Sequence, residues 1–216
     1  SAADGPRFLE TLVLHEGKAL PNAAVLAMVR TDCPVKVFKF DHFRPTETRM
    51  VVTAADPRRR IVHTINDEPA AREYARLLGK DPAQLTPFIF AAHPVVVQLG
   101  GHHHVRSIRQ VLENDDLIFF CAIDEGLVLT LAEPLNMVAH LSAQLDSLGG
   151  PHAILACDCF LRRVESEEKQ LSGQISALLR QHRVTGFSTY GEQMNAMHVN
   201  QTMTGVALYP PPKARR

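Results

Sequence analysis

Residues 185–209 read TGFSTYGEQMNAMHVNQTMTGVALY, and this stretch organises the rest of the chain. Apolar Phe187, Val206 and Leu208 bracket a dense polar group, which predicts two strands that flank a polar turn region. An ordinary hairpin needs Gly, Asn or Asp at its tip and little else. This stretch instead carries a carboxylate, an imidazole and several amides, so it is either a long polar loop that satisfies its own backbone or a ligand pocket.

Composition and charge narrow the class of protein. The 216 residues are 45% apolar, which is ordinary for a globular protein of one or two domains. The 23 Lys and Arg balance the 23 Asp and Glu, which argues against partners such as nucleic acid or an acidic membrane surface. The sequence has no apolar run of membrane-spanning length and no signal-peptide pattern at its start, so we expect a cytoplasmic protein with reduced thiols.

Apolar periodicity and turn residues predict a chain dominated by strands. Strands are expected at residues 8–14, 23–30, 35–40, 49–54, 60–65, 105–112, 117–123, 127–132 and 153–159. Helices are expected at residues 69–78, after Pro134, and at 165–181. Pro87 and Pro94 predict short extended pieces and loops, and His102, His103 and His104 are interpreted as a solvated turn. The predicted fold is α+β, with mainly antiparallel sheet and about three helices that cover one face.

Two separated sequence blocks resemble a known family. FSTYGEQ at 187–193 and HVNQTMTGVAL at 198–208 resemble the C-terminal signature of the FIST domain, a sensory module of bacterial signalling proteins. The segment at 17–31 is similar to the end of the N-terminal half of FIST proteins. The resemblance therefore implies three parts.

These parts are a remnant of the FIST N-terminal half at residues 1–65, a FIST C-terminal domain at 66–210, and a tail at 211–216. The same resemblance implies a small ligand that binds between the closing hairpin and the strand that begins at Val105. The predicted ligand-binding residues are Arg106, Ser107, Tyr190, Glu192, Asn200 and Thr202. Arg106 is the expected carboxylate anchor, because a guanidinium binds a carboxylate through two hydrogen bonds, although a plain surface ion pair is the alternative.

Catalytic and metal-binding patterns are missing from the sequence. It contains no nucleophile elbow, no phosphate-gripping Gly-rich loop and no His-Glu-x-x-His, and its closest cysteine pair is Cys157-Asp158-Cys159. We therefore predict no catalytic residues, no metal site and no enzyme activity. Adjacent histidines such as His102, His103 and His104 rarely close a tetrahedral site without distant partners.

The identity of the ligand stays open at this level. Some FIST proteins are haem-based nitric-oxide sensors that act on histidine kinases, so the resemblance makes non-covalent haem a candidate cofactor and a histidine kinase a candidate partner. His198 and His93 are the candidate axial ligands, since one imidazole in an apolar pocket can hold haem iron. The alternatives are an amino acid or related metabolite bound by Arg106, Glu192 and Asn200, or a protein-interaction scaffold without a ligand.

Overall fold

The structure, a computed structural model, describes residues 10–211. The chain forms two compact units. Unit 1 contains Ser1–Asp41, Val138–Asn195 and Thr202–Arg216, and unit 2 contains His42–Met137 and Ala196–Gln201. The chain therefore enters unit 2 twice, the second time for only six residues near its end. Among residues 10–211, no helix has the length and apolar character needed to cross a membrane.

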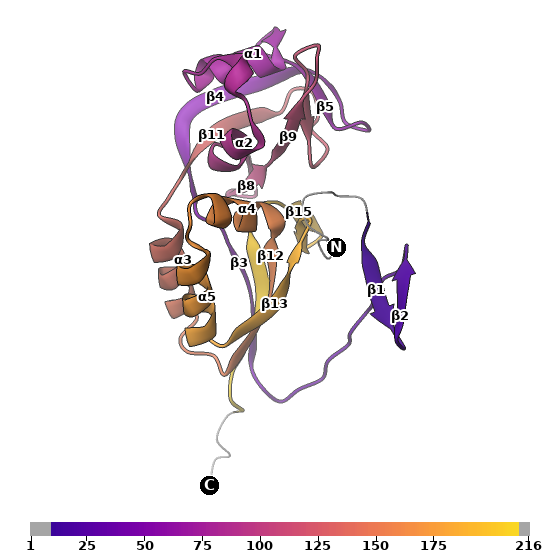
Figure 1. The fold of residues 1–216 in the computed structure, drawn as a ribbon, viewed down its shortest axis with the longest axis vertical. Coiled ribbons are helices and arrows are strands. Elements are labelled where there is room, and N and C mark those ends of the chain that lie inside the picture. The colour runs from indigo at the N-terminus through magenta and orange to yellow at the C-terminus, as the bar shows by residue number, and fades with distance from the viewer. Residues whose placement is uncertain (1–9, 212–216) are drawn as a thin grey trace. The chain divides into compact units, whose positions relative to one another are not determined.

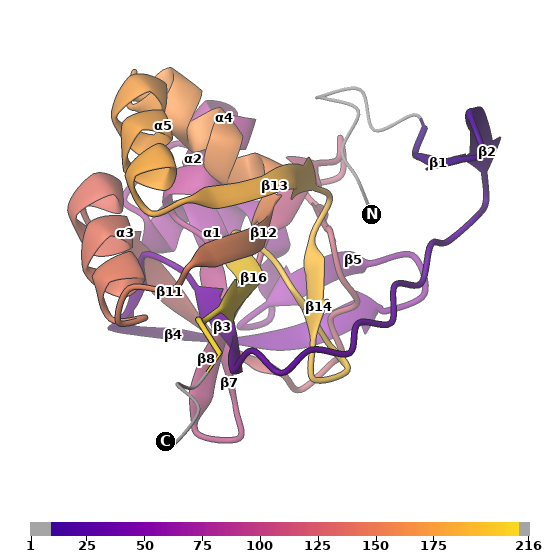
Figure 2. The ribbon, with the colours of Figure 1, turned by 90° about the horizontal axis from the view of Figure 1, so that it is seen from below.

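Unit 1 is built on a four-stranded sheet with three helices on one of its faces (Figures 1 and 2). In sheet order the strands are β13 (Val184–Thr189), β12 (Ala153–Cys159), β16 (Met203–Leu208) and β3 (Val35–Phe40). Only β12 and β13 pair in parallel. The helices are α3 (Met137–Asp146), α4 (Phe160–Glu168) and α5 (Ser172–Gln181). The unit also holds the hairpin of β1 (Leu12–His15) and β2 (Lys18–Pro21), and the short strand β14 (Glu192–Met194).

Unit 2 is an antiparallel sheet that curls back on itself. In sheet order its strands are β8 (His102–Arg106), β7 (Val95–Leu99), β11 (Val128–Pro134), β4 (Phe43–Asp56), β5 (Ile61–Ile65), β10 (Leu117–Phe119) and β9 (Ile108–Val111), with β6 (Glu68–Pro69) beside β5. Its other elements are α1 (Ala70–Leu77), the 3-10 helix η1 (Pro82–Gln84), α2 (Pro87–Ala92) and β15 (Met197–Val199). β8 and β9 stand at opposite ends of the sheet order, yet Ser107 alone separates them in sequence. The two ends of the sheet must therefore meet at Ser107.

The apolar residues of unit 2 fill the inside of this curled sheet. Val52, Val62 and Leu129 are fully buried, and Tyr74 of α1 is buried with them. Successive strand residues point to opposite faces, so one face of each strand supplies the core. The predicted fold class is confirmed, because the structure is α+β with mainly antiparallel pairing.

Two helix predictions are wrong. Residues 87–92 form helix α2 rather than extended pieces, because Pro87 stands in its first turn and the Thr86 hydroxyl accepts a hydrogen bond from the Ile89 N–H. The single helix expected at 165–181 is two helices, α4 and α5. Gln170 lies between them with a φ of 56°, a left-handed backbone that no α-helix accommodates.

Three other predictions differ from the structure or fall outside it. Residues 23–30 form no strand, and the three consecutive histidines lie in strand β8 rather than in a turn. The expected strand at 8–14 is observed only from Leu12, and its first two residues lie outside the described residues. The predicted tail at 211–216 also lies outside them, apart from residue 211.

The backbones of β12 and β13 lie very close together at Gly186, which predicts the effect of a substitution there on stability. A Cβ on Gly186 would lie 1.8 Å from the carbonyl oxygen of Ala156 on the neighbouring strand, so the strands must separate to admit it. We expect Gly186→Ala to lower the free energy of unfolding by about 3 kcal/mol or more in urea denaturation. Gly173→Ala is the matched control, because nothing lies within 4 Å of its Cβ position. That helical substitution is expected to be neutral or to stabilise by up to about 1 kcal/mol. Equal stability of the two variants would contradict the packing described for β12 and β13.

Candidate functional site

The point where the two ends of the unit 2 sheet meet is held by buried side chains. The Ser107 hydroxyl donates to Oε1 of Gln201 at 3.0 Å, and Nε2 of Gln201 donates to the Ala91 carbonyl at 2.8 Å. Ser107 and Gln201 are both almost fully buried, and the Ser107 carbonyl accepts from the Phe120 N–H. Gln201 has a φ of 49°, which bends the chain directly after Asn200. The amide of Gln201 therefore fixes the loop that carries the preceding residues.

Beside this anchor lies the arginine Arg106. Nη1 of Arg106 lies 3.3 Å from the carbonyl of Val105 and 3.5 Å from that of His198. Among residues 10–211 no acidic side chain forms an ion pair with Arg106. Arg60 contributes positive charge to the same place, because both arginines act on the His198 imidazole and on the Cys121 thiol. The combination is a basic site that forms no ion pair with a carboxylate in the described part of the chain.

The surroundings of His198 favour its neutral form. Burial lowers the pKa of His198 below its ordinary value, and the charges of Arg106 and Arg60 lower it further. Nδ2 of Asn200 lies 3.1 Å from Nε2 of His198. Because an amide nitrogen can only donate, Nε2 is the acceptor and the imidazole proton is assigned to Nδ1.

Asn200 leaves a buried acceptor unused. The residue is 2% exposed, and its Oδ1 has no hydrogen-bond partner among the residues that the structure describes. A buried polar atom without a partner costs about 1–3 kcal/mol, so native structures rarely leave one. An N–H or O–H donor from outside the protein would satisfy it. Arg106, His198 and Asn200 thus combine two donors for an anion with an acceptor for a neighbouring N–H.

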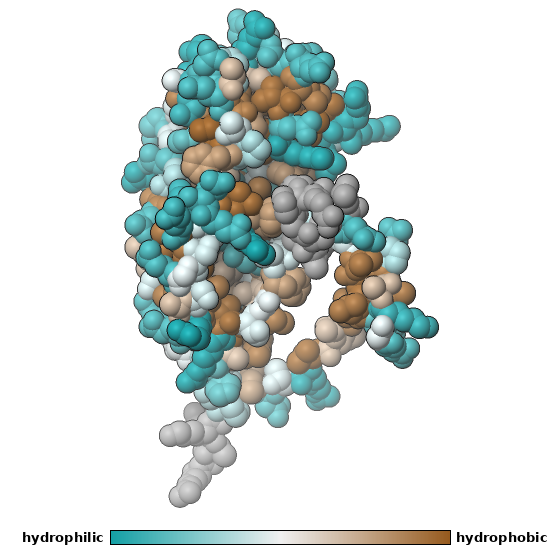
Figure 3. Space-filling view, viewed as in Figure 1, coloured by the Kyte–Doolittle hydropathy of each residue, from teal (hydrophilic) through white to brown (hydrophobic). Residues whose placement is uncertain are grey.

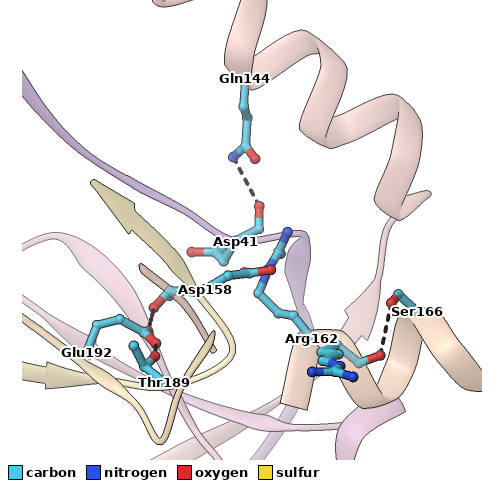
Figure 4. Close-up of polar contacts among 9 residues, drawn as sticks. Asp41, Gln144, Asp158, Arg162, Ser166, Thr189 and Glu192 are labelled. Carbon is cyan, nitrogen blue, oxygen red and sulfur yellow. Dashed lines mark hydrogen bonds and ion pairs between the residues drawn. The ribbon is translucent and has the colours of Figure 1, made fainter. Parts of the chain in front are cut away.

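A second polar cluster lies in unit 1 around Glu192 (Figure 4). Glu192 is buried, and its two oxygens accept hydrogen bonds from the hydroxyls of Thr189 and Thr202. Nearby, Nε of the buried Arg162 donates to Oδ1 of Asp158 at 2.7 Å. Every oxygen of the Glu192 carboxyl is therefore occupied by the protein itself.

The Glu192 carboxyl nevertheless titrates near neutral pH. Burial raises its pKa to about 7, and the hydrogen bonds from Thr189 and Thr202 oppose that rise without cancelling it. The negative charge of Asp158 raises the pKa, and the positive charge of Arg162 lowers it. A structural role for this cluster is consistent with its full set of internal partners, and a ligand would have to displace a hydroxyl.

The predicted site residues fall into two groups, one in each unit. Arg106, Ser107 and Asn200 lie in unit 2. Tyr190, Glu192 and Thr202 lie in unit 1, where Glu192 and Thr202 are bonded and the Tyr190 ring meets Phe160 edge-on at 6.1 Å between centroids.

The two candidate haem ligands, His198 and His93, both belong to unit 2. His93 caps the C-terminus of α2, and its carbonyl accepts from the Tyr74 hydroxyl at 2.5 Å. Within residues 10–211, no three His, Cys, Asp or Glu side chains are grouped as a metal ion would require.

Sequence reasoning did not assign roles to Arg60, Thr189 or Gln201. Gln201 stands inside the quoted signature, and its positive φ and buried amide were not evident from residue type. Thr189 is three residues before Glu192, which is a spacing that allows a local hydroxyl–carboxylate bond. Arg60 ends a turn far from Arg106 in sequence, and no sequence pattern connects them.

Fold and site together define an α+β protein in which Arg106, His198 and Asn200 form a polar cluster. The FIST C domain matches residues 70–195, and the FIST N domain matches residues 1–68. The chain belongs to the FIST family, whose domains sense small ligands in signalling proteins. No curated protein and no solved structure matches the chain.

The raised pKa of Glu192 predicts how stability depends on pH. The unfolded carboxyl, with a pKa of 4.5, loses its proton before the folded one, with a pKa of about 7. Stability is therefore lost as the pH rises from about 4.5 to about 7, by up to about 3 kcal/mol. Glu192→Gln keeps a neutral side chain at every pH. We therefore expect its free energy of unfolding to rise relative to that of the wild type across that pH range in urea denaturation.

Glu167→Gln serves as the control, because Glu167 is exposed and paired with Arg163 at the surface. Its stability should follow the wild-type pH profile. A difference between wild type and Glu192→Gln that stays constant from pH 4.5 to pH 7.5 would contradict the assignment.

Proposed function

We propose that the chain is the sensing part of a signalling protein and that unit 2 binds a small carboxylate-bearing ligand at Arg106, His198 and Asn200. The observation that carries the proposal is the buried Oδ1 of Asn200, which lacks a partner among residues 10–211. Arg106 in the same loop environment lacks a carboxylate partner within those residues. Within the described residues the acceptor has no donor and the cation has no carboxylate, which points to a ligand that carries the complementary groups.

The chemistry of these residues selects the ligand class. The Arg106 guanidinium offers a carboxylate its unused N–H groups, and Arg60 adds long-range attraction. The neutral imidazole of His198 adds an Nδ1–H donor. Oδ1 of Asn200 accepts from an ammonium or amide N–H. An amino acid or a related metabolite carries both the carboxylate and the N–H donor.

Ligand binding is communicated to a partner protein through the loop that contains Asn200. Gln201 holds the loop in one arrangement through Ser107 and Ala91, so a ligand on Asn200 stabilises that arrangement over others. A signalling partner such as a histidine kinase senses the resulting shift in population.

A binding experiment tests the proposal with a matched pair of variants. Isothermal titration with a panel of amino acids and small carboxylates is expected to give saturable binding to the wild type. Arg106→Gln should weaken that binding about tenfold or more, because a hydrogen-bonded ion pair is lost. Arg163→Gln, an exposed arginine paired with Glu167 in unit 1, should bind as the wild type does. Equal affinity of Arg106→Gln and wild type would contradict this site.

Haem is a second candidate ligand of the same chemical class, since its propionates are carboxylates. The specific observation in its favour is a neutral, half-buried His198 beside Arg106 and Arg60. A neutral imidazole is the form that ligates iron, and haem iron would supply nitric-oxide binding. The fit is incomplete at one atom, because Nε2 of His198 already accepts from Asn200 and would have to release that bond. His93 is the rival ligand.

A haem titration followed by visible absorbance separates the two ligands. If haem is bound, the wild type should show a sharp, saturable Soret band, and either His198→Ala or His93→Ala should abolish it. The other of these two variants is then the internal control. A broad, non-saturating band in all three proteins removes haem and leaves the metabolite. Failure of both titrations would instead favour the ligand-free scaffold.

A further inference from the structure

The four-stranded sheet of unit 1 has one covered face and one open face. Helices α3, α4 and α5 lie over the covered face (Figure 2). The open face carries large apolar side chains that are about half exposed or more: Val35 (54%), Val37 (58%), Leu155 (52%) and Phe187 (53%). The register aligns Val37 with Val206 and Leu155 across three strands, and pairs Cys157 with Phe187. These residues therefore form one continuous apolar surface, which we call the open face.

The apolar run in the central strand β12 is typical of a strand that is buried on both faces. In β12, Ile154 and Ala156 point to the helices and are buried, while Leu155 between them points to the open face. A strand with one solvated face alternates apolar and polar residues, whereas a continuous apolar run is typical of burial on both faces. In β3, Phe38 faces the helices, and Val37 faces the open side. Composition thus predicts a cover on the open face.

A second uncovered apolar feature belongs to the same unit. Residues 22–31 join β2 to β3 without regular structure, and their apolar side chains are strongly exposed, as in Leu26 (86%) and Met28 (90%). Figure 3 shows apolar side chains exposed along this connection. Val25 and Val29 are also exposed. An exposed extended segment of this composition favours pairing or packing with another apolar surface.

Charge favours a second copy of this chain as the occupant. Of the strand residues that share the open face, Lys39 is the one with a charge, and it is paired with Asp41 at 3.4 Å. A face without net charge does not repel its own copy and offers a charged partner nothing to bind. The whole chain has a formal net charge of +0 at pH 7, which also removes long-range repulsion between copies.

The open face alone is too small for a stable interface, so residues 22–31 have to contribute area. Thr189, Cys159 and Thr204 share this face but are buried, so only about 13 Å of each strand is open. Four such strands spaced about 4.8 Å apart present roughly 250 Å². A stable interface buries about 800 Å² on each partner, so the open face supplies about a third of that area. We propose that two copies of the chain pack open face against open face, with residues 22–31 of each copy extending the interface over the other.

Size-exclusion chromatography with light scattering tests this interface on the full chain. The wild type should have a mass of twice 23.9 kDa at concentrations well above the dissociation constant. The double variant Leu155→Glu with Phe187→Glu should halve that mass. Both side chains are exposed, so circular dichroism spectra are expected to match those of the wild type. Val128→Glu is the matched control, because Val128 is a 47% exposed strand residue of unit 2, and it should remain dimeric.

The contribution of the connecting segment needs its own variant. Leu26→Asp with Met28→Asp should shift the monomer–dimer equilibrium toward monomer by about tenfold or more in a dilution series. A dimer unaffected by this change would overturn the part assigned to residues 22–31. A wild type that stays monomeric at every concentration, or a dimer that persists in the Leu155→Glu, Phe187→Glu variant, would overturn the interface as a whole.

Discussion

The arrangement of unit 2 depends on the side-chain amide of Gln201. It accepts from the Ser107 hydroxyl and donates to the Ala91 carbonyl, at a place that water does not reach. Ser107 is the single residue between the two end strands of the sheet, so the amide joins the seam of the sheet to helix α2. Losing this amide would leave a buried hydroxyl and a buried carbonyl unpaired, at about 1–3 kcal/mol each. Gln201 is the last residue of the loop that contains His198 and Asn200. Its hydrogen bonds therefore hold that loop in place.

Three of the buried polar side chains near the end of the chain, Glu192, Asn200 and Gln201, differ in how many hydrogen-bond partners the protein gives them. Gln201 and Glu192 have partners at their oxygens from neighbouring residues. Asn200, which is equally buried, has no partner for its Oδ1 among residues 10–211. A fully bonded group stabilises one conformation, while an unsatisfied one creates a preference for an incoming donor. This difference, rather than polarity alone, separates supporting residues from those that can bind a ligand.

Much of the fold was predictable because it is encoded locally. The apolar run at 153–159 is strand β12, residue for residue, and the helix expected at 69–78 is α1. The errors arose where a local signal has two meanings. Pro87 was interpreted as a break, yet Pro in a first turn after Thr86 begins a helix. Continuous helical periodicity across 165–181 concealed the turn at Gln170, because the apolar stripe resumes after it.

The candidate site was harder to predict than the fold. Arg106, Asn200 and His198 were identified from residue type and the family signature, and the structure brings them together in unit 2. Arg60 was not identified, because its proximity depends on the curl of the sheet. The order of the chain has a further consequence for its synthesis. Residues 196–201 complete unit 2, and β16 at 203–208 must insert between β3 and β12. Residues 196–208 therefore have to leave the ribosome before both units can close, so their earlier strands stay without these partners during synthesis.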